Sequence, residues 1–145
     1  MLIKAFVLAY MAHRGQKDKA GKPYILHPVN VAMRVKGKKR KIVALLHDIV
    51  EDTEITLDKL EKMGFDDEIV EAVKAITKVK GEGYGIYLNR VKNNDIAKDV
   101  KLADLKHNGD LSRLKVITLN DLKRAKKYAQ ATLYLTSRGE DIEFC

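Results

Sequence analysis

The sequence predicts an all-α fold, and three observations indicate it. Only two prolines interrupt the chain, its content of Ala, Leu and Lys is high, and apolar residues recur at helical spacing. Hydrophobic residues make up 46% and charged residues 33%, a balance typical of a globular protein. We expect residues 1–145 to form a single domain, with 138–145 as a polar tail.

The first three helices are predicted from apolar spacing and from their stop residues. The helix at 2–13 ends before Gly15, and its core-facing residues are predicted to be Ile3, Phe6, Val7, Tyr10 and Met11. Pro28 fits a first helical turn, so the second helix is expected at 28–36, with His27 at or near its N-cap. The third helix follows the basic run 38–41 and carries the string ALLHD.

Caps, glycine stops and apolar periodicity indicate further helices at 57–63, 66–76, 86–91, 96–107 and 121–136. The core stripe of the helix at 66–76 is predicted to be Ile69, Val70, Val73 and Ile76. Asn120 is expected to cap the last helix, whose inward residues are predicted to be Leu122, Ala125, Ala129 and Leu133.

Charge and cysteine content limit the kinds of partner and the location that we expect for the protein. Lys and Arg outnumber Asp and Glu by 28 to 20, a net charge of +8 that suits an anionic ligand, nucleotide or nucleic acid, without choosing between them. The alternative is a basic but solvated surface, because the lysines are spread along the chain. The basic run at 38–41 has no interleaved aromatic residues, so a nucleic-acid patch there is poorly supported and no nucleic acid is expected. The single cysteine, Cys145, favours a cytoplasmic protein, and no apolar run is long enough to predict a membrane partner.

Four polar residues follow the apolar run 42–46, namely His47, Asp48, Glu51 and Asp52. On a continuous helix, His47 would share a face with Glu51, and Asp48 with Asp52. Such a cluster at the edge of a core needs a cation or a water network. The alternative is a helix end that frays into a solvated acidic loop.

A second polar group lies on the helix predicted at 96–107. Asp104 and Asn108 are four residues apart, and Lys101 stands one turn ahead of them. This set is either a surface salt link or an additional anionic ligand, Asp104, beside an amide that orients water or substrate.

Taken together, the candidate metal ligands are His27, His47, Asp48 and Asp104. Two imidazoles and two carboxylates without a thiolate do not make a usual structural zinc site. Mixed nitrogen and oxygen ligation suits Mn²⁺ or Fe²⁺ with positions open for water and phosphate, and Zn²⁺, Ni²⁺ or Co²⁺ could also occupy it.

At this point the sequence resembles the HD-domain metal-dependent phosphohydrolases. It is most similar to the hydrolase domain of RelA/SpoT-type alarmone enzymes and to small stand-alone alarmone hydrolases. The matching strings lie between about residues 5 and 115: AHRGQ at 12–16, GKPYILHP at 21–28, ALLHDIVEDT at 44–53, Thr77-Lys78, and KLAD…HN at 101–108.

The resemblance implies an all-α bundle whose metal ligands fall on His27, His47, Asp48 and Asp104. It implies that Glu51 and Asp52 are the catalytic pair. The implied reaction removes the 3′-pyrophosphate of (p)ppGpp with Mn²⁺, giving GDP or GTP and pyrophosphate. Substrate contacts are expected from Lys17, Lys19, Tyr24, Lys101 and Asn108.

Two positions depart from the family pattern. Asp18 and Leu105 stand where the alarmone hydrolases have Arg. The alternatives are therefore an HD phosphohydrolase acting on another nucleotide or phosphoester, and a non-catalytic nucleotide-binding relic. For the leading hypothesis we expect Asp18 to point away from the cleft and Lys17 or Lys19 to point in. The length of 145 residues leaves no room for a synthetase domain.

Overall fold

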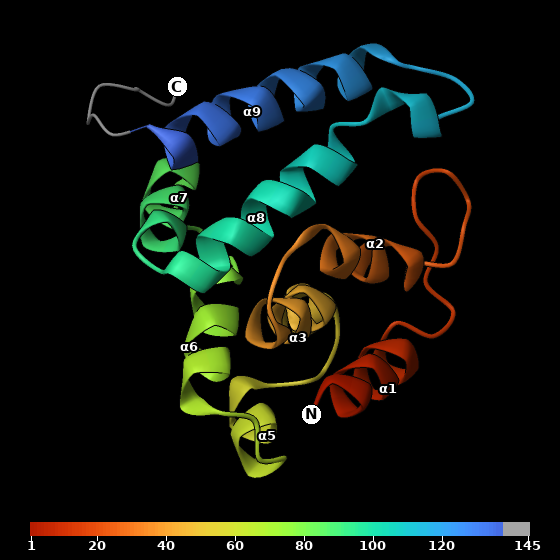
Figure 1. Cartoon of the computed structure of the whole chain (residues 1–145). Coiled ribbons are helices and arrows are strands. Elements are labelled where there is room, and N and C mark those ends of the chain that lie inside the picture. The colour runs from red at the N-terminus through yellow and green to blue at the C-terminus, as the bar shows by residue number, and fades with distance from the viewer. Residues whose placement is uncertain (138–145) are drawn as a thin grey trace.

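The computed structural model describes residues 1–137, so the polar tail predicted at 138–145 lies outside the described residues. Within 1–137 the chain forms helices and no strand apart from a single bridge between Lys17 and Pro23, which confirms the all-α prediction (Figure 1). The helices are α1 (Leu2–Ala12), α2 (Leu26–Arg34), α3 (Lys38–Leu46), α4 (Ile49–Asp52), α5 (Leu57–Lys62), α6 (Asp67–Ile76), α7 (Tyr84–Lys92), α8 (Asp95–Asn108), the 3-10 helix η1 (Leu111–Arg113) and α9 (Leu119–Thr136).

The centre of the core is α3, which contacts α1, α2, α6 and α8 and lies between them in Figure 1. All five residues from Ile42 to Leu46 are buried, because the helix is covered on every side. The predicted stripe of α6 is confirmed: Ile69, Val70, Val73 and Ile76 are all buried. This packing fixes the C-terminal end of α3, where the polar cluster begins.

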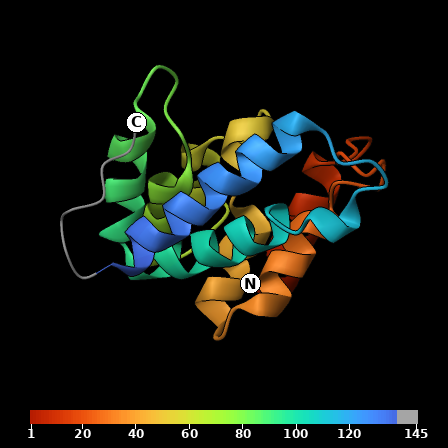
Figure 2. The same ribbon diagram turned by 90° about the horizontal axis from the view of Figure 1, so that it is seen from above.

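Helix α9 lies across α8, contacting both α7 and α8, as the two views in Figures 1 and 2 show. The predicted inward face of α9 is wrong. Leu122 and Leu133 are 50% and 61% exposed, whereas Ala131 and Leu135 are buried. The true N-cap is Thr118, which forms a capping box with Asp121, so the helix begins before the predicted cap at Asn120.

The predicted core face of α1 is also wrong. The five residues assigned to the core are exposed, and the buried positions are Ala5 and Ala9. Two alanines allow α1 to approach α3 closely, which larger side chains would prevent. The exposed residues of the predicted face are Ile3, Phe6, Val7, Tyr10 and Met11.

Two helix ends near the polar cluster differ from expectation. Helix α2 begins at Leu26, so His27 lies in its first turn instead of at the N-cap, and Pro28 occupies a turn position that needs no amide donor. Helix α3 ends at Leu46, because the ring of His47 bonds to the carbonyl oxygen of Ala44 (Nδ1 to O, 2.6 Å). A continued helix would give that carbonyl to the amide of Asp48.

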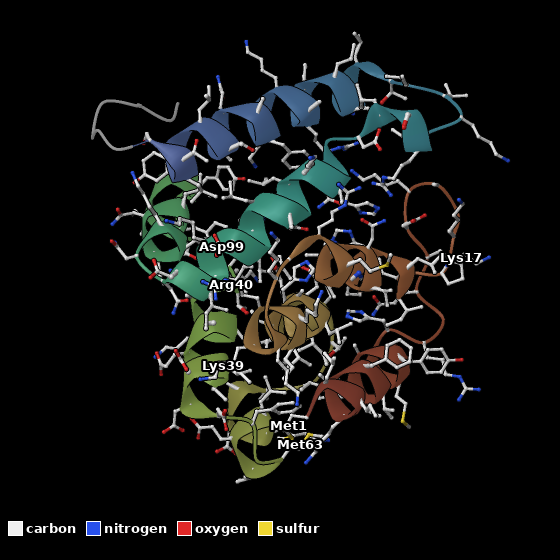
Figure 3. All side chains as sticks on the ribbon, viewed as in Figure 1. Met1, Lys17, Lys39, Arg40, Met63 and Asp99 are labelled. Carbon is white, nitrogen blue, oxygen red and sulfur yellow. The ribbon has the colours of Figure 1, made fainter. Side chains whose placement is uncertain are left out.

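Ion pairs connect the basic first turn of α3 to α6 and α8. Arg40 donates to Asp99 of α8 at 2.7 Å, and Lys39 pairs with Glu68 of α6. Figure 3 shows Arg40 and Asp99 facing each other, with Lys39 below them. Among residues 1–137, no helix combines the length and apolar character needed to cross a membrane.

Candidate metal centre

Four side chains converge where α2, α3 and α8 meet. His27 comes from the first turn of α2, His47 and Asp48 follow α3, and Asp104 lies in the middle of α8. One ligand-type atom from each residue lies within 4.8 Å of all the others. His27, His47 and Asp104 are buried, and Asp48 is partly exposed. The structure thus brings together the four side chains that the sequence suggested as ligands.

The contacts within this group are short. Nε2 of His27 lies 2.8 Å from Oδ1 of Asp104 and 3.7 Å from Oδ2 of Asp48. Nε2 of His47 lies 3.2 Å from Oδ1 of Asp104 and 3.1 Å from Oδ2 of Asp48. Both imidazoles therefore aim the same kind of nitrogen at the same two carboxylates.

Surrounding groups hold these side chains in place. Nδ1 of His47 donates to the carbonyl oxygen of Ala44, which leaves Nε2 facing the carboxylates. The hydroxyl of Tyr24 donates to Oδ2 of Asp48. Lys101 and Asn108 both donate to Asp104, at 2.9 and 3.0 Å. Such outer contacts orient ligands in metalloproteins.

The charges of this buried group act strongly on one another. Burial alone would lower the pKa of His47, but Asp48 and Asp104 raise it well above its ordinary value. Burial alone would raise the pKa of Asp104, but Lys101 and the two histidines hold it well below its usual range. In the protein alone, a proton on His47 and the ammonium group of Lys101 therefore help to balance the carboxylates.

A divalent cation fits this donor set. Two imidazole nitrogens and two carboxylate oxygens facing one point are ligands for a borderline or hard divalent ion. Such an ion would replace the protons that the imidazoles share with the carboxylates, and it would compensate the buried negative charge. The residues that would hold it are His27, His47, Asp48 and Asp104.

Glu51 and Asp52 lie on α4, one turn after the ligand-type pair, and both are exposed. Burial and the nearby charge of Asp48 raise the pKa of each carboxyl. The two residues do not belong to the convergent group of four. They are therefore available for proton transfer at the edge of the site.

A polar pocket of about 220 Å³ opens beside the convergent group. Its lining includes Glu51 and four cationic side chains, namely Lys78, Lys101, Arg124 and Lys127. Lys127 lies over the ring of Tyr84, 4.1 Å from its centroid. The proximity of Lys101 and Lys127, together with burial, lowers the pKa of Lys78. Four positive charges around one pocket indicate a place where an anion can bind.

A second pocket of about 340 Å³ adjoins the first. The two share Tyr24, Asn108, Arg124 and Tyr128. Leu111, Leu114 and Tyr128 give the second pocket apolar surface, and its lining also includes the basic residues Lys17, Lys19, Arg113 and Arg124. We name the first the inner pocket and the second the outer pocket. Together they form a cleft in which the inner pocket can bind an anion and the outer pocket is more apolar.

The residues expected to contact substrate fall into two groups. Tyr24, Lys101 and Asn108 contact the ligand-type carboxylates directly, as described above. Lys17 and Lys19 line the outer pocket, and Figure 3 shows that Lys17 extends outward from the first loop at the edge of the molecule. Lys17 is therefore a rim residue.

The expectation that Asp18 points away from the cleft is not met, because Asp18 lines the outer pocket. Its Oδ1 accepts from the backbone amides of Ala20 and Lys22, at 2.9 and 3.0 Å. Its Oδ2 lies 3.8 Å from Nη1 of Arg113. The carboxylate closes its own loop as a turn residue and is paired with a cation, which reduces its repulsion of an anion.

Leu105 is 2% exposed and belongs to the hydrophobic core. Leu105 therefore lines neither of the two pockets.

Several cleft residues are not among the predicted site residues: Tyr84, Arg113, Arg124, Lys127 and Tyr128, as well as Lys78, which entered only through the matching string Thr77-Lys78. Arg124, Lys127 and Tyr128 share one face of α9 at spacings of three, four and one, which is a detectable signal once the inward face is known. The predicted inward face of α9 is shifted by about one residue from the true one, so the sequence does not reveal that these three residues face the cleft.

Comparisons with known proteins identify the family of this chain. The profile of the family described as HD domain matches residues 5–134. A probable guanosine-3′,5′-bis(diphosphate) 3′-pyrophosphohydrolase from Synechocystis sp. is 36% identical over 123 residues, which cover 74% of this chain and 16% of the relative. The corresponding hydrolase from Aquifex aeolicus is 30% identical over 139 residues, covering 90% of this chain and 20% of the relative. The chain thus spans about a fifth or less of the length of these relatives.

A solved structure described as a metazoan ortholog of SpoT that hydrolyses ppGpp has a TM-score of 0.77. It is 24% identical to this chain, and the match covers 98% of this chain and 89% of that one. At this level of identity the likeness shows that the two proteins share a fold.

Proposed function

Since the chain belongs to the HD domain family, we propose that it is a metal-dependent phosphohydrolase that removes the 3′-pyrophosphate of (p)ppGpp. The products are GDP or GTP and pyrophosphate. The observation that carries this proposal is the convergence of His27, His47, Asp48 and Asp104 within 4.8 Å beside a pocket lined by three lysines. The names of the similar proteins support the choice of substrate.

Mn²⁺ is the proposed cofactor, held by the four convergent side chains. Mixed imidazole and carboxylate ligation with positions open to water suits Mn²⁺ in six-coordination. When bound, the ion lowers the pKa of a water molecule and polarises a phosphoryl oxygen.

Glu51 and Asp52 are the proposed catalytic pair. A carboxylate of the pair aligns the attacking water and takes its proton as the new bond to phosphorus forms. The 3′-oxygen leaves with the electrons of the broken bond to phosphorus and receives a proton from the same pair. The raised pKa of both carboxyls favours this exchange, because it brings their proton affinity closer to neutral pH.

The two pockets suit the two ends of this substrate. Lys78, Lys101 and Lys127 of the inner pocket neutralise the 3′-pyrophosphate next to the ligand-type group. In the outer pocket, Tyr128 and Leu111 offer apolar surface for the nucleoside, and Lys19 and Arg113 offer charge for the 5′-phosphates.

Asp18 supports a second candidate, an HD phosphohydrolase that acts on a less anionic nucleotide or another phosphoester. Its carboxylate lines the outer pocket and adds negative charge where a 5′-diphosphate would lie. A non-catalytic nucleotide-binding role is less well supported, because Glu51 and Asp52 are both present beside the convergent group.

A substrate panel with Mn²⁺ tests the proposal. Purified protein is incubated with ppGpp, pppGpp, other nucleotides and simple phosphoesters, and products are identified by chromatography and mass. We expect GDP and pyrophosphate from ppGpp at the highest kcat/KM of the panel. Faster turnover of a nucleotide without a 3′-pyrophosphate would favour the second candidate, and turnover of none would favour the non-catalytic role.

A further inference from the structure

His107 is a buried histidine of α8 that lies next to the convergent group without belonging to it. Its ring stacks on the ring of His27, with centroids 4.9 Å apart and an interplanar angle of 27°. Nδ1 of His107 lies 2.7 Å from Nδ1 of His27. Two ring nitrogens this close must share one hydrogen, so one ring donates and the other accepts.

The direction of this hydrogen bond follows from the use of Nε2 in His27. In the protein alone that nitrogen lies 2.8 Å from Oδ1 of Asp104 and donates a hydrogen bond to it. When Nε2 binds an ion, its lone pair is occupied and the proton leaves. The neutral ring then carries its remaining proton on Nδ1, and Nδ1 must donate to His107.

The surroundings of His107 suit an acceptor. The ring of His107 is buried, and its Nδ1 lies 2.7 Å from Nδ1 of His27. A neutral imidazole carries a lone pair on one ring nitrogen and can accept a hydrogen bond there. Nε of Arg113 donates to the carbonyl oxygen of His107 at 3.1 Å, which fixes the main chain that carries the ring.

We propose that His107 is a positioning residue, whose Nδ1 accepts the Nδ1–H of His27 and so holds Nε2 of His27 toward the metal site. His47 is fixed differently, because its Nδ1 donates to the main-chain oxygen of Ala44. Metal-binding histidines usually donate to a carboxylate, a carbonyl or water. In this chain a neutral imidazole takes that place for one of the two ligands, and the inference rests on the metal site proposed above.

The first test measures Mn²⁺ binding by calorimetry for the wild type, His107→Leu and His107→Asn. Leu keeps much of the bulk but has no acceptor, whereas Asn can offer an oxygen near the position of Nδ1. We expect His107→Leu to raise the Kd for Mn²⁺ by about 10- to 100-fold, the usual effect of losing an outer-shell partner. His107→Asn should recover most of that loss.

Lys106→Leu is the matched control, because Lys106 is the exposed neighbour of His107 on α8, and it should bind Mn²⁺ like the wild type. Unchanged Mn²⁺ affinity in His107→Leu would overturn the inference. Equal losses in the Leu and Asn variants would also overturn it, because they would assign the effect to packing instead of the acceptor.

A second readout needs no variant. In nitrogen-15 spectra of the Zn²⁺-loaded wild type, His27 should carry its proton on Nδ1, and His107 should carry its proton on Nε2 with a bare Nδ1. A proton on Nδ1 of His107, or a doubly protonated ring, would contradict the proposal. Both measurements are made without substrate, so failure of the protein to hydrolyse ppGpp would leave this result standing, and the reverse also holds.

Discussion

The ammonium group of Lys101 lies 2.9 Å from Oδ2 of Asp104, so the chain supplies its own cation to one of the four convergent side chains. The pair is largely buried, with the side chains 13% and 5% exposed. Asp104 raises the pKa of Lys101 above its ordinary value, although burial alone would lower it. Lys101 therefore stays charged and helps to keep Asp104 ionised.

Replacing Lys101 by Met should destabilise the protein when no divalent ion is present. Removing one partner of a buried ion pair leaves an uncompensated charge, and we expect a loss of about 3 kcal/mol in the free energy of unfolding. Mn²⁺ should restore part of this loss, because it supplies a cation to the same carboxylate. Urea denaturation with EDTA and with Mn²⁺ measures both effects.

Lys39→Met is the control for Lys101→Met. Lys39 pairs with Glu68 on the surface, where both side chains are at least half exposed. Its loss should cost about 1 kcal/mol or less, with no response to Mn²⁺. Equal losses in the two variants would show that the buried pair has no special role.

Glu51→Gln and Asp52→Asn should separate catalysis from metal binding. Both side chains are exposed at the edge of the site and lie outside the convergent group. Each variant should bind Mn²⁺ like the wild type and lose at least ~10²-fold in kcat, the usual size of a general acid–base contribution. Steady-state kinetics and calorimetry check this, with Glu54→Gln as an exposed control; weakened Mn²⁺ binding would instead make the residue a ligand.

Lys127→Ala and Lys78→Ala should chiefly raise KM. Both side chains line the inner pocket, where each is proposed to contact the pyrophosphate group. Loss of one charge-assisted contact should raise KM about tenfold or more. Lys123→Ala, an exposed position on the same helix, should leave KM unchanged, and an equal effect there would mean that general charge is responsible.

Asp18→Ala and Asp18→Asn should differ in their KM for ppGpp. Asn keeps the oxygen that accepts from Ala20 and Lys22, so the loop should hold its shape. We expect Asp18→Asn to hydrolyse ppGpp like the wild type, and Asp18→Ala to raise KM by about tenfold at most, as its loop loses two hydrogen bonds. Better turnover of ppGpp by Asp18→Ala would show that the carboxylate repels the substrate.

Acid should weaken the loop that carries Lys78. Arg90 donates to both oxygens of Glu82, each at 2.7 Å. These bonds and that of the Val79 amide lower the pKa of Glu82 from 4.5 to about 2. Because the folded-state pKa is depressed, the stabilisation is fully present above pH 4.5 and is lost as the pH falls toward 2.

The difference in Tm between the wild type and Glu82→Gln tests this assignment. It should be constant above about pH 5 and shrink as the pH falls below that. Glu61→Gln, an exposed glutamate on α5, should show no such change. A difference independent of pH would mean that the ion pair does not stabilise the fold.

The sequence predicted the polar side chains that converge, because their residue types suit a divalent ion and their order resembles that of the HD-domain hydrolases. It could not select the buried face of α1 or α9. The apolar residues of α1 surround the whole helix, so periodicity did not reveal that Ala5 and Ala9 face α3. On α9, Leu122 and Leu133 were better core candidates by hydrophobicity than Ala131, yet the last is buried.

The role of His107 could not be predicted either. In the sequence it is the last residue of an apolar stripe, and nothing in the spacing of α8 reveals a partner 80 positions away. The contact between the two Nδ1 atoms depends on how α2 packs against α8. Local patterns therefore indicated the ligand-type residues, while tertiary packing determined what surrounds them.

Titration of Mn²⁺ into metal-depleted protein, with ppGpp hydrolysis followed in the same samples, tests the central claim most directly. Turnover to GDP and pyrophosphate should rise from zero and saturate at about one ion per chain, as four convergent ligands imply. Asp48→Ala should neither bind the ion nor turn over ppGpp, with its helical content retained. Turnover in the chelated wild type, or full activity in Asp48→Ala, would contradict the account.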